Sequence, residues 1–209
     1  MKYLFYLCCS ILILLYCKTS EVNYQKTNTA IQSGDIIFQT TNSSQCKAVQ
    51  LATHSRYSHV GIIFEKDDDL YVYEAVQPVR ITGLDEWIEH GVDEHYVIKR
   101  LKNAKEVLTP EIITEMQAIG ETHLGKNYDL AFAWSDERIY CSELVWKIYN
   151  QATGIIIGNL QKLKEFDLSS PIVQAKLKER YGEYIPYEEE VISPAAMFES
   201  DLLITIEEG

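Results

Sequence analysis

The amino-acid sequence predicts an α+β fold, in which helices pack against an antiparallel sheet. Residues 57–64 and 70–76 are rich in β-branched and aromatic side chains and flank an acidic turn, a pattern typical of a β-hairpin. Residues 109–123 and 141–152 have the apolar spacing and end signals of helices. The chain has 209 residues, a length that fits one domain after a leader is removed.

The first residues differ from the rest of the chain. Lys2 precedes an uncharged apolar run over residues 3–16, which is shorter than the roughly 20 residues of a membrane-spanning helix. Such a run is typical of a secretory signal. Because Cys17 and then polar residues follow it, we expect residues 1–17 to be a lipoprotein-type signal peptide. Cys17 is then the lipidation site that anchors an exported protein to a membrane of the bacterial cell envelope, in the periplasm. A plain cleaved signal and an uncleaved short anchor stay open as alternatives.

Residues 18–32 are polar and lack periodicity, so we expect a tether, followed by a single folded domain over residues 33–209. Ser33 to Asp35 favour a turn. In the next part of the chain a short apolar run predicts a strand, a mixed segment predicts one or two helical turns, and the hairpin follows. The expected elements up to the first long helix are strand 36–38, helix 45–53, strands 57–64 and 70–76, helix 84–90 and strand 96–101.

The second half of the domain is expected to be mainly helical. Thr109 is a good N-cap with Pro110 at the first helical position, and Gly125 and Gly154 are stop signals. Loop signals and aromatic residues fill the segment between the two long helices. The expected elements are helices 109–123, 141–152 and 172–181, a short helix from 193, and an edge strand at 202–206.

Charge and cysteine content exclude several classes of protein. The formal net charge of −12 argues against a nucleic-acid partner, which would require a basic face. It also argues against electrostatic docking on anionic lipid. Outside the leader only Cys46 and Cys141 occur, which is no disulfide framework, although a single bridge between them stays open. Outside the leader the sequence lacks an H-E-x-x-H motif and a closely spaced cysteine pair, so no metal and no cofactor are expected.

Three residues form a candidate catalytic group. Cys141 falls at the start of a predicted helix, where partial positive charge and free N–H groups favour a thiolate. A cysteine there, with a nearby histidine, would be an activated nucleophile, whereas a buried structural cysteine is the alternative. His59 lies on the first hairpin strand, where a core histidine is the alternative. Glu74 lies on the second strand, and a buried glutamate is rare unless it is paired.

Hairpin register decides whether His59 and Glu74 can meet. A loop over residues 66–69 pairs Glu65 with Leu70. His59 and Glu74 then lie on one face as diagonal neighbours. A slip by one residue would move Glu74 to the opposite face. The spacing therefore permits a Cys–His–Glu relay.

Several segments resemble the permuted papain-like amidases of the YaeF/YiiX group, a circularly permuted branch of the NlpC-type papain-like superfamily. They are S-G-D-I-I-F-Q, Y-S-H-V-G-I-I-F-E, Y-V-Y-E-A-V, I-Y-C-S-E-L-V-W and V-I-S-P-A. The resemblance covers roughly residues 33–206. Its motif order, histidine and carboxylate before cysteine, is the permuted one. It implies a permuted papain-like fold with the nucleophile at a helix N-terminus, and a triad of Cys141, His59 and Glu74.

The same resemblance points to residues that would bind the substrate. In the superfamily a tyrosine some dozen residues before the nucleophile lines the site, and the segment ending in Tyr128 matches it. Tyr128 would help to hold the oxyanion with the backbone N–H of Cys141, while a packing aromatic is the alternative. Tyr140 precedes the nucleophile and is a candidate to shape the pocket.

These observations predict a thiol-dependent hydrolase, an amidase or peptidase, that acts through an acyl-enzyme. The resemblance implies an amide bond in a cell-envelope molecule, such as a peptidoglycan peptide, as the substrate. A lipid-directed acyl hydrolase or acyltransferase is a second possibility, which apolar side chains around the cleft would favour. A non-catalytic envelope binding module is a third.

Overall fold

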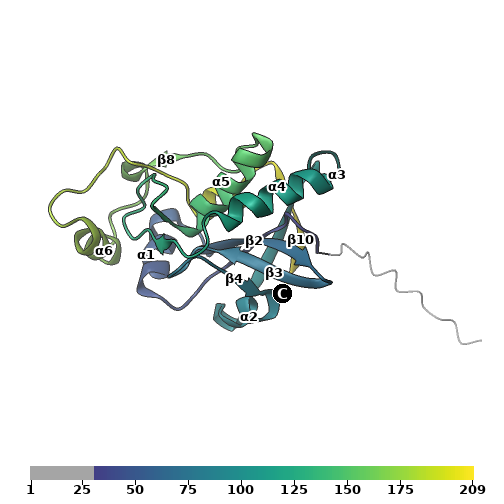
Figure 1. The fold of residues 1–209 in the computed structure, drawn as a ribbon. Helices are drawn as coiled ribbons and strands as arrows, with labels where there is room; N and C mark the ends of the chain where they lie inside the picture. The colour runs from purple at the N-terminus through teal and green to yellow at the C-terminus, as the bar shows by residue number, and fades with distance from the viewer. Residues whose placement is uncertain (1–30) are drawn as a thin grey trace, which may run out of the picture.

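The computed structural model describes residues 31–209, and its largest sheet has six strands in the order β10-β5-β1-β2-β3-β4. Every neighbouring pair in this sheet is antiparallel. Helices α4 and α5 cover one face and α2 lies against the other, while α1 and α6 lie together at one end (Figure 1). The predicted α+β class is confirmed. The expected leader 1–17 with Cys17, and the tether up to residue 30, lie outside the described residues.

The element bounds follow the expected order closely. The strands are β1 Ile36–Gln39, β2 His59–Lys66, β3 Asp69–Glu74, β4 Arg80–Gly83, β5 Tyr96–Leu101, β6 Asn127–Tyr128, β7 Arg138–Ile139, β8 Gln161–Lys162, β9 Glu190–Val191 and β10 Leu203–Glu208. The α-helices are α1 Ser44–Thr53, α2 Leu84–Glu89, α3 Ala104–Val107, α4 Pro110–Glu121, α5 Cys141–Thr153, α6 Pro171–Tyr181 and α7 Pro194–Phe198. Two short 3₁₀ helices are η1 Val92–Glu94 and η2 Leu163–Glu165.

The hairpin of β2 and β3 has the predicted register, since Glu65 pairs with Leu70. Its turn is tighter than the four residues expected. The strands extend to Lys66 and from Asp69, and the two aspartates between them, Asp67 and Asp68, have φ values of 54° and 68°. Two positive φ values in a two-residue turn suit the right-handed twist of the strands. The strand β3 ends at Glu74 rather than at residue 76.

The strand β4 was not expected from the sequence. It pairs with β3 and places Arg80 opposite Glu74 and Thr82 opposite Val72. Its four residues carry one buried side chain, that of Thr82, so it lacks the apolar run by which a short strand is usually recognised. This strand extends the sheet beside the candidate carboxylate.

Alternate side chains of the central strands enter two separate apolar layers. Ile36 and Phe38 of β1 pack in the layer beneath α4 and α5. Ile37, between them, packs with Trp87 of α2 on the opposite face. Strand side chains alternate between faces, and β1 is buried on both, with all four of its residues buried. Each fully buried isoleucine contributes roughly 2 kcal/mol of transfer free energy.

No helix within residues 31–209 is long and apolar enough to cross a bilayer. Cys46 and Cys141 are both buried free thiols, so the open possibility of a bridge between them is not realised in the structure.

Candidate active site

Cys141 is the first residue of α5, and its side chain is only 4% exposed. Tyr140 is the N-cap, and its backbone N–H donates to Glu143 Oε2 at 3.3 Å. The apolar stripe of α5 packs across β2, which brings the first turn of the helix over the start of that strand. The first N–H groups of a helix have no intrahelical acceptor and lie at its positive end. An anionic sulfur or oxygen at Cys141 is therefore favoured there.

His59 lies at the start of β2 and is joined to Glu74 at the end of β3. His59 Nε2 is 2.8 Å from Glu74 Oε2, and both side chains are at least nine-tenths buried. Since Nε2 of His59 is hydrogen-bonded to Glu74, the other ring nitrogen, Nδ1, is the one that can bond to the Cys141 thiol. The imidazole also stacks on Trp87, with 5.7 Å between ring centroids. Trp87 and Glu74 together fix the plane of the ring.

Electrostatics favour the ionised forms of this pair. Burial disfavours the imidazolium, but hydrogen bonding to Cys141 and Glu74 outweighs it and raises the pKa of His59 to about 10. Burial likewise disfavours the carboxylate, but His59, Thr82 and Arg80 outweigh it and lower the pKa of Glu74 to about 2. At neutral pH the site therefore contains an imidazolium paired with a carboxylate.

Glu74 has two further partners, which sequence reasoning missed. Thr82 Oγ1 donates to Glu74 Oε1 at 2.7 Å, and Arg80 Nε donates to the same oxygen at 3.0 Å. Both side chains belong to β4, and they leave Oε2 for His59. The only sequence signal for these partners is that polar residues, Arg80 and Thr82, occupy alternate positions of a segment shortly after Glu74. These bonds fix which carboxylate oxygen faces the histidine.

The two predicted tyrosines lie beside the nucleophile but differ in their partners. The Tyr128 hydroxyl accepts from Gln45 Nε2 at 2.9 Å. Burial, followed by the nearby Cys141 and Cys46 thiols, raises the pKa of Tyr128 well above its usual value, so this phenol stays protonated. The Tyr140 hydroxyl accepts from the backbone N–H of Ile192 at 3.1 Å. Tyr140 therefore forms part of the pocket wall, and Tyr128 is the side chain available to an oxyanion.

A cavity of about 80 Å³ opens beside Cys141, and its exposed lining is almost entirely apolar. Tyr128, Tyr140 and Ser142 line it together with the nucleophile. Segments far apart in the sequence supply the rest of the wall, namely Val49, Ala52, Leu163, Phe166, Val191 and Pro194. The surroundings of the thiol thus suit an apolar group rather than a charged one.

The chain matches the family described as permuted papain-like amidase enzyme, YaeF/YiiX, C92 family, over residues 30–207. It belongs to that family. Members are papain-like cysteine amidases or peptidases, so this chain is an enzyme of the cysteine hydrolase type. The resemblance inferred from the sequence motifs is confirmed, and with it the permuted papain-like fold.

Two relatives of this permuted papain-like amidase have been described. It is 53% identical to the uncharacterized protein YiiX of Escherichia coli (strain K12) over 175 residues, which are 84% of this chain and 85% of that protein. It also matches a crystal structure described as that of metalloprotein yiiX from Escherichia coli O157:H7. That match has a TM-score of 0.81 and 52% identity, and it covers 85% of this chain and 97% of the other. Within residues 31–209 of this amidase, no three or more His, Cys, Asp or Glu side chains lie together in a way that could hold a metal ion.

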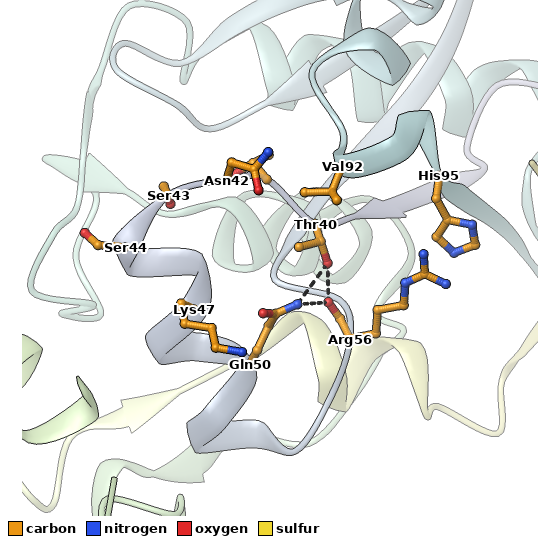
Figure 2. A pocket seen from close by; sticks show the side chains of 10 residues that line it. Thr40, Asn42, Ser43, Ser44, Lys47, Gln50, Arg56, Val92 and His95 are labelled. Atoms are coloured by element: carbon orange, nitrogen blue, oxygen red, sulfur yellow. Dashed lines mark hydrogen bonds between the residues drawn. The ribbon is translucent and has the colours of Figure 1, made fainter. Parts of the chain in front are cut away.

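A larger groove, of about 530 Å³, lies on another side of α1 (Figure 2). Polar and cationic side chains line it, among them Thr40, Lys47, Gln50, Arg56 and His95. Gln50 Nε2 donates to the Thr40 hydroxyl and to the Arg56 carbonyl (Figure 2). None of the three candidate catalytic residues lines this groove, whereas Cys141 lines the smaller cavity.

Proposed function

We propose that the protein is an exported thiol-dependent amidase in which Cys141, His59 and Glu74 act as nucleophile, acid–base and orienting carboxylate. One observation carries this proposal. His59 is hydrogen-bonded to Glu74 at 2.8 Å and lies beside a cysteine at the first position of α5. An imidazole held in this way can protonate a leaving group, and a thiol beside it can attack a carbonyl carbon.

The reaction would proceed in two stages. The Cys141 sulfur bonds to the carbonyl carbon, and the oxyanion that forms accepts from the Cys141 backbone N–H and the Tyr128 hydroxyl. The carbon–nitrogen bond then breaks as the His59 imidazolium donates its proton to the departing amine. In the second stage His59 accepts a proton from water, whose oxygen attacks the thioester. The carbon–sulfur bond breaks, and a carboxylic acid and the Cys141 thiolate result, with the proton from water left on His59.

The cavity beside the thiol limits the acyl part of the substrate. Its volume of about 80 Å³ is smaller than the roughly 150 Å³ of an engineered apolar cavity that holds benzene. A short aliphatic side chain or acyl group fits that space, whereas a long acyl chain would extend beyond it. This size favours an amide of a peptide, such as a peptidoglycan peptide, over a lipid. The apolar lining is the feature that favours the alternative, a lipid-directed acyl hydrolase or acyltransferase.

A series of acyl p-nitroanilides separates these readings. Acetyl and butyryl p-nitroanilides should be hydrolysed, whereas octanoyl p-nitroanilide should react at least about tenfold more slowly. A lipid-directed enzyme would instead gain roughly fourfold in kcat/KM for each further CH₂ that it buries. Ala52→Phe should fill the cavity and remove the reaction of the butyryl compound, with Ala175→Phe on the exposed side of α6 as the matched control. Hydrolysis that is as fast with Cys141→Ala as with wild type would refute the thiol mechanism and favour a binding module instead.

Attachment to the cell envelope is a separate part of the proposal. It rests on the sequence of the leader, in which Cys17 follows an apolar run. A lipid-anchored enzyme would meet envelope substrates at the membrane surface. Cells given radiolabelled palmitate should label the protein, and Cys17→Ser should abolish that label. Retention of the label in Cys17→Ser would contradict lipidation at this cysteine.

A further inference from the structure

The amide of Gln45, in the first turn of α1, joins two side chains from distant parts of the chain. Its Nε2 donates to the Tyr128 hydroxyl at 2.9 Å. Its Oε1 accepts from Arg180 Nη2 of α6, also at 2.9 Å. A second tie between the same two helices runs from Lys176 Nζ to Ser44 Oγ at 3.2 Å. The helix α6 thus holds the first turn of α1 against the short strand β6, which carries Tyr128.

The chemistry of these groups fixes the direction of both hydrogen bonds. A guanidinium has only donors, so the atom of Gln45 that faces Arg180 must be the carbonyl oxygen. The amide nitrogen then faces Tyr128 and can only donate to it. The hydroxyl of Tyr128 accepts this bond, and its single proton is free to point elsewhere.

The hydroxyl also lies within hydrogen-bonding reach of the Cys141 sulfur. Burial raises the pKa of Tyr128 most, and Cys141 raises it further. Tyr128 and Cys141 line the same cavity. A phenol proton turned away from Gln45 therefore points toward the space where a substrate oxyanion would form.

We propose that Gln45 is a positioning residue, held by Arg180, that directs the hydroxyl proton of Tyr128 toward the oxyanion formed at Cys141. This inference rests on the proposed thiol chemistry and goes beyond it. The side-chain hydrogen bonds of Gln45 go to Tyr128 and Arg180, and not to the nucleophile or the acid–base pair. It acts through the phenol, and it links the rate of acyl transfer to the docking of α6 on α1.

Gln45→Glu is the sharpest test, because it keeps the size of the side chain and reverses one hydrogen bond. One carboxylate oxygen still accepts from Arg180, while the other now accepts the proton of Tyr128 and withdraws it from the site. The assay is the burst of nitrophenolate from p-nitrophenyl acetate, in which the sulfur bonds to the acetyl carbon and nitrophenolate leaves. Alkylation of Cys141 by iodoacetamide, followed by mass spectrometry, is measured in parallel, because that displacement forms no oxyanion.

We expect Gln45→Glu to slow acylation about 10²-fold, the usual loss for one oxyanion donor, and to equal Tyr128→Phe. The double variant should be no slower than either single one. Alkylation should stay within about twofold of wild type, and Gln174→Glu, on the exposed side of α6, should leave both rates unchanged. Gln45→Met, which adds no charge, should lose less, because it frees the hydroxyl to rotate without capturing its proton.

Three results would overturn the inference. An acylation rate in Gln45→Glu within about threefold of wild type would show that the orientation of the Tyr128 hydroxyl does not depend on Gln45. A double variant whose losses multiply would show that Gln45 acts independently of Tyr128. A parallel fall in acylation and alkylation would show that Gln45 only supports the fold. A wild-type burst that persists in Cys141→Ala would instead refute the proposed function itself, and the inference with it.

Discussion

Replacing Glu74 with glutamine tests how much the buried imidazolium–carboxylate pair stabilises the fold. The pKa of Glu74 is lowered from 4.5 to about 2, so the folded protein binds this proton less tightly than the unfolded chain. A gap of about 2.5 pH units corresponds to roughly 3 kcal/mol of unfolding free energy. Arg80 is 44% exposed on its side chain and adds little of it, since solvent screens its charge. Most of the effect comes from His59 and Thr82.

The sign of this effect depends on pH in a defined way. Because the folded-state pKa is depressed, the stabilisation is fully present above about pH 4.5 and is lost as the pH falls toward 2. Glu74→Gln mimics the protonated acid, so it should unfold more easily than wild type by about 3 kcal/mol at pH 6 and by about 1 kcal/mol at pH 2.5. Urea denaturation at a series of pH values measures this difference. Glu65→Gln, an exposed position on β2, serves as the matched control and should show no such gap.

A difference between wild type and Glu74→Gln that stays constant from pH 6 to pH 2.5 would refute the reasoning. It would mean that the carboxylate is not ionised in the folded protein, or that its partners do not depend on its charge. A difference that grows as the pH falls would reverse the predicted sign and would refute it as well.

Two further predictions concern packing and a buried ion pair, and both are measured by urea denaturation. Gly120→Ala in α4 places a Cβ 2.6 Å from a ring carbon of Tyr73 and should lower the free energy of unfolding by about 1–2 kcal/mol. The control Gly83→Ala adds a Cβ that meets nothing within 4 Å and should leave stability unchanged. Equal stabilities of the two variants would contradict this prediction. Asp35 is fully buried and accepts from Arg100 Nε and Nη2 at 2.7 Å each, so Asp35→Ala should cost about 3–5 kcal/mol because it removes one partner of a buried ion pair. A loss below about 1 kcal/mol would show that this ion pair does little to stabilise the fold.

The main candidate residues could be predicted because each lies in a strong local pattern. Cys141 follows a loop and begins an amphipathic helix, and the hairpin register needed only the paired residues near its turn. That register alone places His59 and Glu74 on one face of the hairpin. Where the prediction differed, the turn was shorter by two residues, which leaves the pairing unchanged because both strands lengthen equally.

The remaining parts of the site depend on packing between distant segments. Strand β4, with Thr82 and Arg80, has no apolar run, so its position beside Glu74 had no clear sequence signal. Gln45 lies on a helix that was expected, but its contact with Tyr128 depends on how α1 and α6 pack. The cavity is likewise built from α1, η2 and the residues before α7. Tertiary packing sets such features, and local periodicity does not report it.

Alkylation of Cys141 by iodoacetamide between pH 6 and pH 9, in wild type and His59→Ala, tests the central claim most directly. Since the imidazolium of His59 persists up to a pKa of about 10, we expect a fast, nearly constant rate in wild type. In His59→Ala the rate at pH 6 should fall at least about 30-fold and should rise with pH as for an unassisted thiol. Mass spectrometry separates Cys141 from Cys46. Equal rates and equal pH profiles in the two proteins would contradict an activated Cys141–His59 pair.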